Sequence, residues 1–171
     1  VLPAPCVGRC EQAPVVVVHQ KPVANATAEA VQAAVAAKAT THEPEPDPGS
    51  LFGFDAYVAQ GGYALWRDCI EGRHDVESVI KTMEDSGLRG LGGAGFPAGR
   101  KWRIVRNETA PRLMAVNIDE GEPGTFKDRW YLERDPHRFI EGMLIAAWAV
   151  GIDRLYVYLR DEYHGLRGLL E

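Results

Sequence analysis

The stretch Ser86-Gly-Leu-Arg-Gly-Leu-Gly-Gly-Ala-Gly-Phe-Pro-Ala-Gly-Arg-Lys-Trp102, the glycine loop, is the most informative part of this chain. Six of the thirteen residues from Gly87 to Gly99 are glycine. Glycine has no Cβ atom, so the backbone can take left-handed turns and approach a ligand closely. Successive exposed backbone N–H groups bind anions, and Lys101 follows where its ammonium group can reach the same anion. The stretch therefore predicts a phosphate-binding loop.

Two common nucleotide motifs do not describe the glycine loop. It follows a predicted helix rather than a strand, unlike the dinucleotide fingerprint, and it lacks the Gly-Lys-Ser/Thr of nucleoside-triphosphate loops. A flexible linker is the other interpretation of so many glycines, but such linkers are polar. This stretch contains Leu91, Phe96, Pro97 and Trp102. We therefore interpret it as a binding site.

Helix and strand signals alternate on either side of the glycine loop. Residues 62–71 and 75–86 carry apolar residues at helical spacing. Residues 112–117 have the composition of a strand, and residues 118–130 form a Gly- and Pro-containing loop rich in acidic residues. Because helices and strands alternate along the chain, the sequence predicts an α/β fold.

A longer helix is expected after this loop. Asp135-Pro136 is a strong helix start, with Asp as the N-cap and Pro at the first helical position. Gly151 is expected to end this helix. Residues 154–159 then alternate like a strand, and a final helix is expected over residues 161–171.

The acidic loop, Asn117-Ile-Asp-Glu-Gly-Glu-Pro-Gly-Thr-Phe-Lys-Asp-Arg129, follows a predicted strand, where α/β proteins place ligands. Asp119, Glu120 and Glu122 are three carboxylates within four residues. Ionised carboxylates accept hydrogen bonds, for example from ribose hydroxyls or a ring N–H. Asn117 both donates and accepts, which suits the edge of a heterocycle. A solvated turn is the alternative interpretation, and this loop alone does not decide between the two.

The first 38 residues have a different composition. They contain Cys6 and Cys10, the valine run 15–18, and an Ala-rich stretch over residues 27–38. Four consecutive valines favour a buried strand, and the Ala-rich stretch favours a helix. We expect the closing half of a small α/β domain. Three cysteines do not make a disulfide framework here, and Cys69 is expected to be a small buried apolar residue.

A Pro- and acid-rich segment separates this region from the rest of the chain. In residues 39–53, three prolines alternate with acidic residues, which a helix or a central strand does not tolerate. The predicted organisation is therefore a small domain over residues 1–38, a linker over 39–53, and a second domain over 54–171.

Charge and hydropathy exclude several classes of function. The net charge of −5, with scattered Lys and Arg, argues against nucleic-acid binding. No apolar stretch reaches the length of a membrane span, and nothing resembles a signal peptide. We expect a soluble cytoplasmic protein. Because the chain begins at Val1 without an initiator Met and stops at Glu171 inside a predicted helix, we expect it to be a piece of a longer polypeptide.

The two loops together resemble those of the NADH-oxidising flavoprotein subunit of respiratory complex I. They are also similar to the equivalent subunits of NAD-reducing hydrogenases and NAD-linked formate dehydrogenases. The resemblance covers residues 54–171 and includes Tyr158-Leu-Arg-Asp-Glu-Tyr163. It implies a Rossmann-like FMN- and NADH-binding domain. This domain is incomplete here, because the family's Tyr-Ile-Cys-Gly-Glu-Glu stretch and its later Cys-rich [4Fe–4S] domain are absent from the sequence.

The resemblance implies a role for individual residues. The FMN-binding residues would be Gly90, Gly92, Gly93, Lys101, Asn117, Asp119 and Glu120. The NADH-binding residues would be Phe96, which stacks on adenine, and Glu120 and Glu122, which lie beside the nicotinamide and its ribose. Asp128 and Arg129 would fix the acidic loop. The chain departs from the family at Leu91, Ile118 and Ile104, where relatives carry Arg, Ala and a second Phe; the last weakens an aromatic sandwich around adenine.

Residues 4–14 and the valine run resemble the second half of a thioredoxin-like [2Fe–2S] domain. The resemblance implies that Cys6 and Cys10 are the downstream two of four thiolate ligands. A remnant domain with two free thiols is the alternative. The fusion of the two modules resembles the β subunit of soluble formate dehydrogenases or the diaphorase subunit of hydrogenases.

The function implied is electron transfer between NAD(H) and iron–sulfur clusters through FMN. The expected protein is the β subunit of an NAD-dependent formate dehydrogenase. Its partner would be a molybdenum or tungsten catalytic α subunit with iron–sulfur clusters. The equivalent subunit of an NAD-reducing hydrogenase or of complex I is one alternative. A cofactor-free module that binds partner subunits and a regulatory nucleotide-binding domain are alternatives from other classes.

Overall fold

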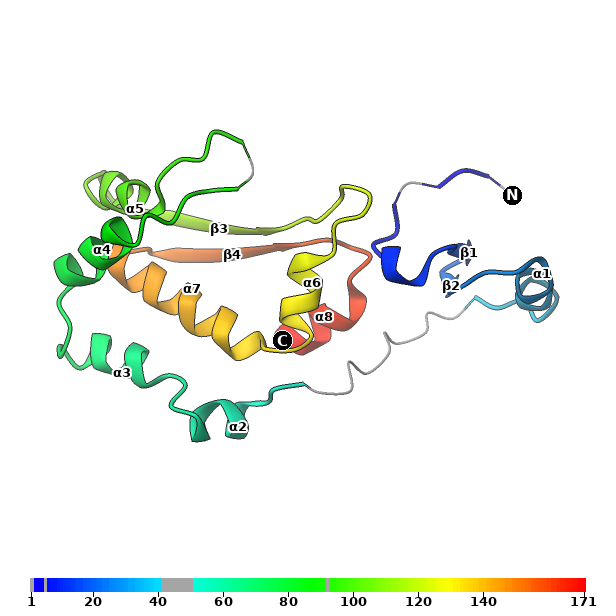
Figure 1. Ribbon diagram of the computed structural model, residues 1–171, viewed down its shortest axis with the longest axis horizontal. Helices are drawn as coiled ribbons and strands as arrows, with labels where there is room; N and C mark the ends of the chain where they lie inside the picture. Colours follow the sequence, from blue (N-terminus) through cyan, green and yellow to red (C-terminus); the bar gives the residue numbers. More distant parts are fainter. Residues whose placement is uncertain (1, 5, 41–50, 92) are drawn as a thin grey trace. The chain divides into compact units, whose positions relative to one another are not determined.

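The computed structural model describes residues 2–4, 6–40, 51–91 and 93–171 (Figure 1). The chain divides into two compact units. The first comprises Val1–Ser50, Ile118–Arg134 and Leu159–Glu171, and the second comprises Leu51–Asn117 and Asp135–Tyr158. Most of the expected linker, residues 41–50, lies outside the described residues, and the expected domain boundaries stay a prediction.

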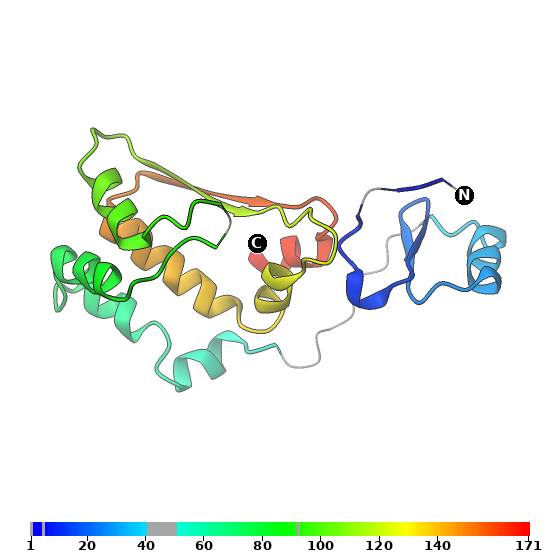
Figure 2. The ribbon, with the colours of Figure 1, turned by 45° about the horizontal axis from the view of Figure 1, so that its top comes forward.

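A strand–helix–strand unit forms the centre of the fold. Strand β3 (Leu113–Ile118), helix α7 (Pro136–Val150) and strand β4 (Arg154–Leu159) follow one another, with α7 running along the two paired strands (Figures 1 and 2). The Asp153 N–H donates to the Arg112 carbonyl at one end of the pair (2.8 Å), and Arg160 N–H donates to the Ile118 carbonyl at the other (3.3 Å). The strands are therefore parallel, an arrangement that requires a crossover connection such as α7. The predicted α/β fold is confirmed.

Helix α7 has the ends that the sequence predicts. The Asp135 carboxylate accepts the Arg138 backbone N–H (3.2 Å), and Pro136 is the first helical residue. Gly151 ends the helix with a φ of +73°. The left-handed conformation favours glycine, and a Cβ atom there would also displace the end of the Arg112 side chain, whose guanidinium nitrogen lies 2.7 Å from that position.

Four further helices of the second unit pack against α7: α2 (Phe54–Ala59), α3 (Ala64–Ile70), α4 (Val76–Asp85) and α5 (Ala98–Arg106). The helices expected over 62–71 and 75–86 are confirmed as the shorter α3 and α4. Ile80 of α4 is almost fully buried, as is Cys69 of α3. Burial raises the pKa of the Cys69 thiol, which fits the expected apolar role.

The first unit begins with a β-hairpin and a helix. Strand β1 (Val16–Val18) pairs antiparallel with β2 (Lys21–Val23), and α1 (Ala28–Ala36) follows with Thr27 as its N-cap. The expectation that the valine run is a buried strand is wrong for most of the run. Only Val18 is buried, while Val17 is 38% exposed. Successive strand residues point to opposite faces, so Val17 lies on the face opposite to Val16 and Val18 and is only partly covered there.

The first unit also contains residues 118–129 of the acidic loop, α6 (Lys127–Leu132) and α8 (His164–Leu170). The short helix η1 (Cys10–Gln12) follows the first cysteine. The expected final helix is confirmed as α8. Helix α6 occupies the last part of the segment expected to be loop. Among the described helices, none is both long and apolar enough to cross a membrane.

Candidate functional site

Hydrogen bonds close the glycine loop at its base. Gly90 N–H donates to the Phe96 carbonyl (3.1 Å), and Ala98 N–H donates to the Leu88 carbonyl (2.8 Å). The Arg89 guanidinium adds a bond to the Gly95 carbonyl (3.0 Å). The ends of the loop are thus held together directly before α5 begins.

The described glycines at the tip of this loop are not required by packing within the protein. A Cβ atom at Gly90 or Gly93 would meet nothing within 4 Å, whereas one at Gly99 would lie 2.4 Å from the Glu84 nitrogen. Gly99 therefore serves the contact between α4 and α5. The open space at Gly90 and Gly93, the latter with a φ of +96°, fits a ligand that approaches the backbone.

The remaining predicted residues of the glycine loop region are placed as follows. Gly92 lies outside the described residues. Phe96 is 44% exposed, and the guanidinium carbon of Arg100 lies 5.8 Å from the centre of its ring. Lys101 is an exposed residue in the first turn of α5. The side chains of Phe96 and Lys101 are therefore both accessible to a ligand.

The residues of β3 and the start of the acidic loop alternate between an exposed and a buried face. Asn117 and Asp119 are exposed, whereas Ile118 and Glu120 are buried. This alternation is the two-residue period of a strand. The carboxylates of Asp119 and Glu120, adjacent in sequence, therefore lie in different environments.

The Glu120 carboxylate is bonded inside the protein, where its side chain is 1% exposed. It accepts the backbone N–H groups of Asp128 (3.0 Å) and Arg129 (3.3 Å) and the Tyr163 hydroxyl (3.1 Å). Burial acts to raise the pKa of Glu120, but these donors and Lys127 outweigh it and lower the pKa. The carboxylate therefore caps the first turn of α6, which has free N–H groups and a partial positive charge.

The acidic loop turns at residues 122–125. Thr125 N–H donates to the Glu122 carbonyl (3.0 Å), Pro123 is the second residue, and Gly124 is the third with a φ of +85°. Pro followed by a Gly of positive φ is typical of a type II turn. The Glu122 side chain at this turn is exposed, in contrast to Glu120.

Two buried arginines connect this region to the Cys loop, residues 6–10. Arg129 donates to the Gly8 carbonyl (2.7 Å) and pairs with Glu11. Arg160 donates to the carbonyls of Glu120 (2.6 Å) and Cys6. The role predicted for Arg129, to fix the acidic loop rather than contact a ligand, stays a prediction, and the bonds above connect its side chain to the Cys loop and Glu11.

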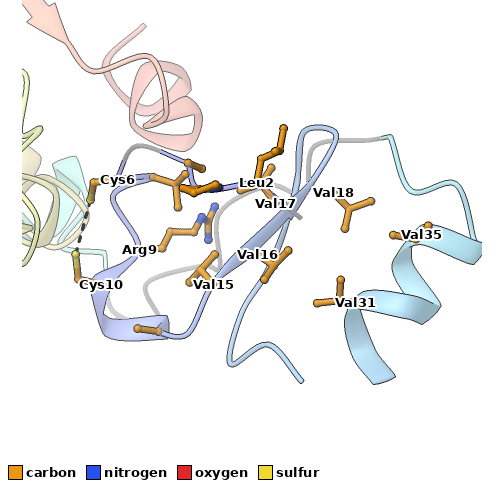
Figure 3. Close-up of a pocket in the computed structure, with 14 residues that line it drawn as sticks. Leu2, Cys6, Arg9, Cys10, Val15, Val16, Val17, Val18, Val31 and Val35 are labelled. Atoms are coloured by element: carbon orange, nitrogen blue, oxygen red, sulfur yellow. Dashed lines mark hydrogen bonds between the residues drawn. The ribbon is translucent and has the colours of Figure 1, made fainter. Parts of the chain in front are cut away.

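The two cysteines of the Cys loop lie close together. Their sulfur atoms are 4.0 Å apart, and both residues line a cavity of about 590 Å³ whose other lining residues are mostly apolar (Figure 3). Two thiolates on one tetrahedral metal with bonds of about 2.3 Å lie about 3.8 Å apart. Gly124 N–H also donates to Cys10 Sγ (3.2 Å). The pair therefore fits one iron of a [2Fe–2S] cluster, although the described residues contain no group of three or more metal-binding side chains.

Three contributors to this region were missed in the sequence: Arg160, Tyr163 and Gly8. Tyr163 is almost fully buried, and a Cβ atom at Gly8 would lie 2.5 Å from its ring. Gly8 also has a φ of +70°. The only sequence signal was that Arg160 and Tyr163 belong to the stretch 158–163, which carries part of the family resemblance.

Comparison with known proteins identifies the segment that holds both loops. Residues 83–167 match the Nuo51 FMN-binding domain family. The chain is 47% identical over 108 residues to a subunit of the NADH-quinone oxidoreductase of Rhizobium meliloti, covering 63% of this chain and 25% of that protein. It is 53% identical over 96 residues to the alpha subunit of the NAD-reducing hydrogenase HoxS of Cupriavidus necator, covering 56% of this chain and 16% of that protein.

A solved structure extends the similarity to almost the whole chain. The crystal structure of an NAD+-reducing [NiFe]-hydrogenase in the air-oxidised state superposes with a TM-score of 0.73 and 32% identity. The match covers 96% of this chain and 31% of that chain. This chain thus spans a quarter or less of the two curated relatives described above.

A parallel strand–helix–strand unit that carries these two loops defines a Rossmann-like α/β domain of the flavin-binding class. Within that class, residues 83–167 belong to the NADH-binding flavoprotein family. The predicted family is confirmed. The thioredoxin-like nature of the first 38 residues and the individual ligand-binding residues stay predictions.

Proposed function

We propose that this chain carries the FMN- and NADH-binding part of an NAD-linked oxidoreductase subunit. The observation that carries the proposal is the glycine loop, whose open glycine backbone lies within the segment that matches an FMN-binding domain family. Because the Gly90 N–H is used to close the loop, the N–H groups that follow it in the loop would bind the phosphate, and the first turn of α5 adds the cation of Lys101.

The FMN-binding residues proposed are Gly90, Gly92, Gly93 and Lys101 for the phosphate and ribityl chain, and Asn117, Asp119 and Glu120 for the isoalloxazine edge. The exposure of Asn117 and Asp119 on one face supports their role. The internal bonds of Glu120 give its carboxylate a second role, because capping α6 holds the acidic loop in place.

The NADH-binding residues proposed are Phe96, Glu120 and Glu122. The exposed ring of Phe96 offers a face for stacking on adenine. The exposed carboxylate of Glu122 is available to accept bonds from ribose hydroxyls.

Bound FMN would supply the redox chemistry, taking hydride from NADH as one two-electron step and passing electrons on singly. The exchange needs no general acid and no nucleophile from the protein. The residues of the two loops bind and orient the two cofactors so that their reacting atoms are aligned. Asn117 and Asp119 would hydrogen-bond to the flavin edge and so tune its electron affinity.

We further propose that Cys6 and Cys10 are two of the four thiolates of a [2Fe–2S] cluster. Their sulfur separation of 4.0 Å and the N–H donor to Cys10 support this role. A [4Fe–4S] cluster is proposed for the C-terminal part of the complete protein, by analogy with the family.

The complex we favour is a cytoplasmic NAD-dependent formate dehydrogenase, in which a molybdenum or tungsten catalytic subunit is the partner. The fusion of a Cys loop with the FMN module supports it. The same fusion fits an NAD-reducing hydrogenase, and the relatives above also support a complex I subunit. Metal analysis of the purified complex separates these alternatives, since molybdenum or tungsten supports the first and nickel supports the second.

An anaerobic visible spectrum of the purified complex, recorded before and after NADH addition, tests the central proposal. We expect the flavin band at about 450 nm to bleach together with iron–sulfur absorbance. A complex with no flavin band would favour a cofactor-free module that binds partner subunits. Tight NADH binding without flavin would favour a regulatory nucleotide-binding domain.

Glu122→Gln tests the NADH site separately from the FMN site. We expect weaker NADH binding with full flavin content, because the amide is a poorer acceptor for ribose hydroxyls than the carboxylate. The matched control is Glu108→Gln, another exposed glutamate outside the loops. Equal loss of NADH and flavin in Glu122→Gln would contradict the assignment.

A further inference from the structure

The acidic loop donates a hydrogen bond to a cysteine of the Cys loop. Gly124 is the third residue of the turn at 122–125, and its N–H points away from the turn to Cys10 Sγ at 3.2 Å. The two residues are 114 positions apart in the sequence. The Cys loop therefore does not determine the surroundings of its own sulfur atoms.

Three more contacts hold the Cys loop against the same part of the first unit. Arg129 of the acidic loop donates to the Gly8 carbonyl, Arg160 donates to the Cys6 carbonyl, and Gly8 lies against the Tyr163 ring. Arg129 and Arg160 are both buried, as is Tyr163. Because a buried guanidinium is costly without its partners, these bonds fix the Cys loop to the acidic loop.

A chain of bonds continues from these groups to Glu120. Arg160 donates to the Glu120 carbonyl (2.6 Å), and the Tyr163 hydroxyl donates to the Glu120 carboxylate (3.1 Å). Glu120, one of the residues proposed to lie beside the cofactors, is therefore bonded to two of the residues that hold the Cys loop.

We propose that the acidic loop tunes the reduction potential of the cluster on Cys6 and Cys10. It would do so through the hydrogen bond that Gly124 N–H donates to Cys10 Sγ. The proposal rests on the proposed function, because it requires that the two thiolates bind a cluster. An N–H donor to a ligand sulfur stabilises the extra negative charge of the reduced cluster, which raises its reduction potential. The nucleotide-binding loop would thereby set how readily the neighbouring cluster accepts an electron.

Gly124→Val in the complete protein tests the donor. A Cβ atom at Gly124 meets nothing within 4 Å, so the change acts through the φ of +85°, which a β-branched residue does not tolerate. The turn must rearrange, and the N–H leaves Cys10. The matched control is Gly72→Val, since Gly72 has a φ of +77° and an equally open Cβ position but lies in the turn between α3 and α4.

The readout is the midpoint potential of the [2Fe–2S] cluster, measured from the EPR signal of its reduced form during a redox titration. Loss of one hydrogen bond to a charged group should lower the ratio of reduced to oxidised cluster about tenfold at a fixed potential. This change corresponds to about 59 mV for one electron. Gly72→Val should leave the potential unchanged, and Gly124→Asn should come closer to the wild type than Gly124→Val, because Asn tolerates positive φ.

Iron and flavin contents separate the possible failures. An unchanged potential in Gly124→Val with full iron content overturns the tuning role and leaves the proposed function intact. A wild-type protein with flavin but no [2Fe–2S] signal overturns both the cluster assignment and this inference, and a protein without flavin overturns the proposed function itself. If Gly124→Val loses its iron, Gly124→Ala decides in its place, and a wild-type potential there overturns the inference.

Discussion

Two buried glutamates, Glu141 in α7 and Glu120 in the acidic loop, are held in the protein in similar ways. Each carboxylate accepts a bond from a tyrosine hydroxyl, Tyr57 for Glu141 and Tyr163 for Glu120. Each also accepts two backbone N–H groups at the start of a helix, α3 in one case and α6 in the other. Burial and the adjacent carboxylate raise the pKa of both tyrosines, so both hydroxyls remain protonated donors.

The two regions differ in what the residues around each carboxylate contact. The donors to Glu141 come from α2, α3 and the turn between them, so the carboxylate joins these helices to α7. Around Glu120, Arg129 and Arg160 continue to the carbonyls of the Cys loop. A buried carboxylate that caps a helix therefore does not by itself mark a functional site. The side chains around it decide whether it supports packing or a ligand-bearing loop.

Glu141→Ala should have the largest effect, on stability alone. It leaves the Tyr57 hydroxyl and the N–H groups of Tyr63 and Trp66 without their acceptor. Because each unsatisfied buried donor costs about 1–3 kcal/mol, we expect the free energy of unfolding to fall by about 4 kcal/mol in denaturant titrations. The control Glu71→Ala removes an exposed ion pair and should cost less than about 1 kcal/mol. A similarly small decrease in the free energy of unfolding in both variants would show that the Glu141 hydrogen bonds do not stabilise the fold.

Gly8→Ala should have the next largest effect, and it should act on the Cys loop. The methyl group would lie 2.5 Å from the Tyr163 ring, at a φ of +70°. We expect a loss of about 3 kcal/mol, from backbone strain and the displaced ring together, and a lower iron content by metal analysis. Gly72→Ala, with a φ of +77° and no atom within 4 Å of its Cβ, measures the backbone strain alone. Equal effects in the two variants would rule out the contact with Tyr163.

Because the pKa of Glu120 is lowered in the folded protein, the free energy of unfolding should depend on pH in the acid range. The folded pKa lies below the unfolded value of about 4.3. The stabilisation is therefore fully present above that value and is lost as pH falls through the folded pKa. Glu120→Gln should be less stable than the wild type at neutral pH by on the order of 1 kcal/mol, and the difference should narrow in acid. Melting temperatures measured across the acid range provide the check.

Tyr163→Phe is the matched variant for this pH dependence. It removes one donor to the Glu120 carboxylate and keeps the ring against Gly8. The change of its melting temperature between neutral and acid pH should lie between the changes for the wild type and Glu120→Gln. A stability difference between Glu120→Gln and wild type that is the same at neutral and acid pH would refute the role of these donors.

Lys127→Ala should have the smallest effect. The Lys127 ammonium lies 3.3 Å from the Glu120 carboxylate, but its side chain is 69% exposed. Solvent screens such a pair, so we expect the free energy of unfolding to change by less than about 0.5 kcal/mol. A loss comparable to that of Glu120→Gln would mean that the ammonium, rather than the N–H groups of α6, holds the buried carboxylate.

The sequence predicts an element well when residues within that element determine it, and poorly when residues elsewhere in the chain do. The ends of α7 were predicted because Asp135, Pro136 and Gly151 act on their own helix. The sequence predicts a loop over residues 118–130 and misses the start of α6, because this helix is short and its first turn is capped by a side chain outside the helix, that of Glu120. The valine run was predicted as buried from composition, but the exposure of Val17 depends on which face of the hairpin is covered.

The sequence by itself determined the α/β order of elements, the limits of α7, and the two loops that place the chain in its family. These features depend on residues a few positions apart, through backbone conformation and side-chain period. Only the tertiary structure decided that Glu120 faces inward while Asp119 is exposed, and that Arg129 and Arg160 contact the Cys loop. Those arginines bond to residues 121 and 154 positions away, because a buried guanidinium needs more acceptors than the one carboxylate that its own segment supplies, Glu133 for Arg129 and Glu162 for Arg160.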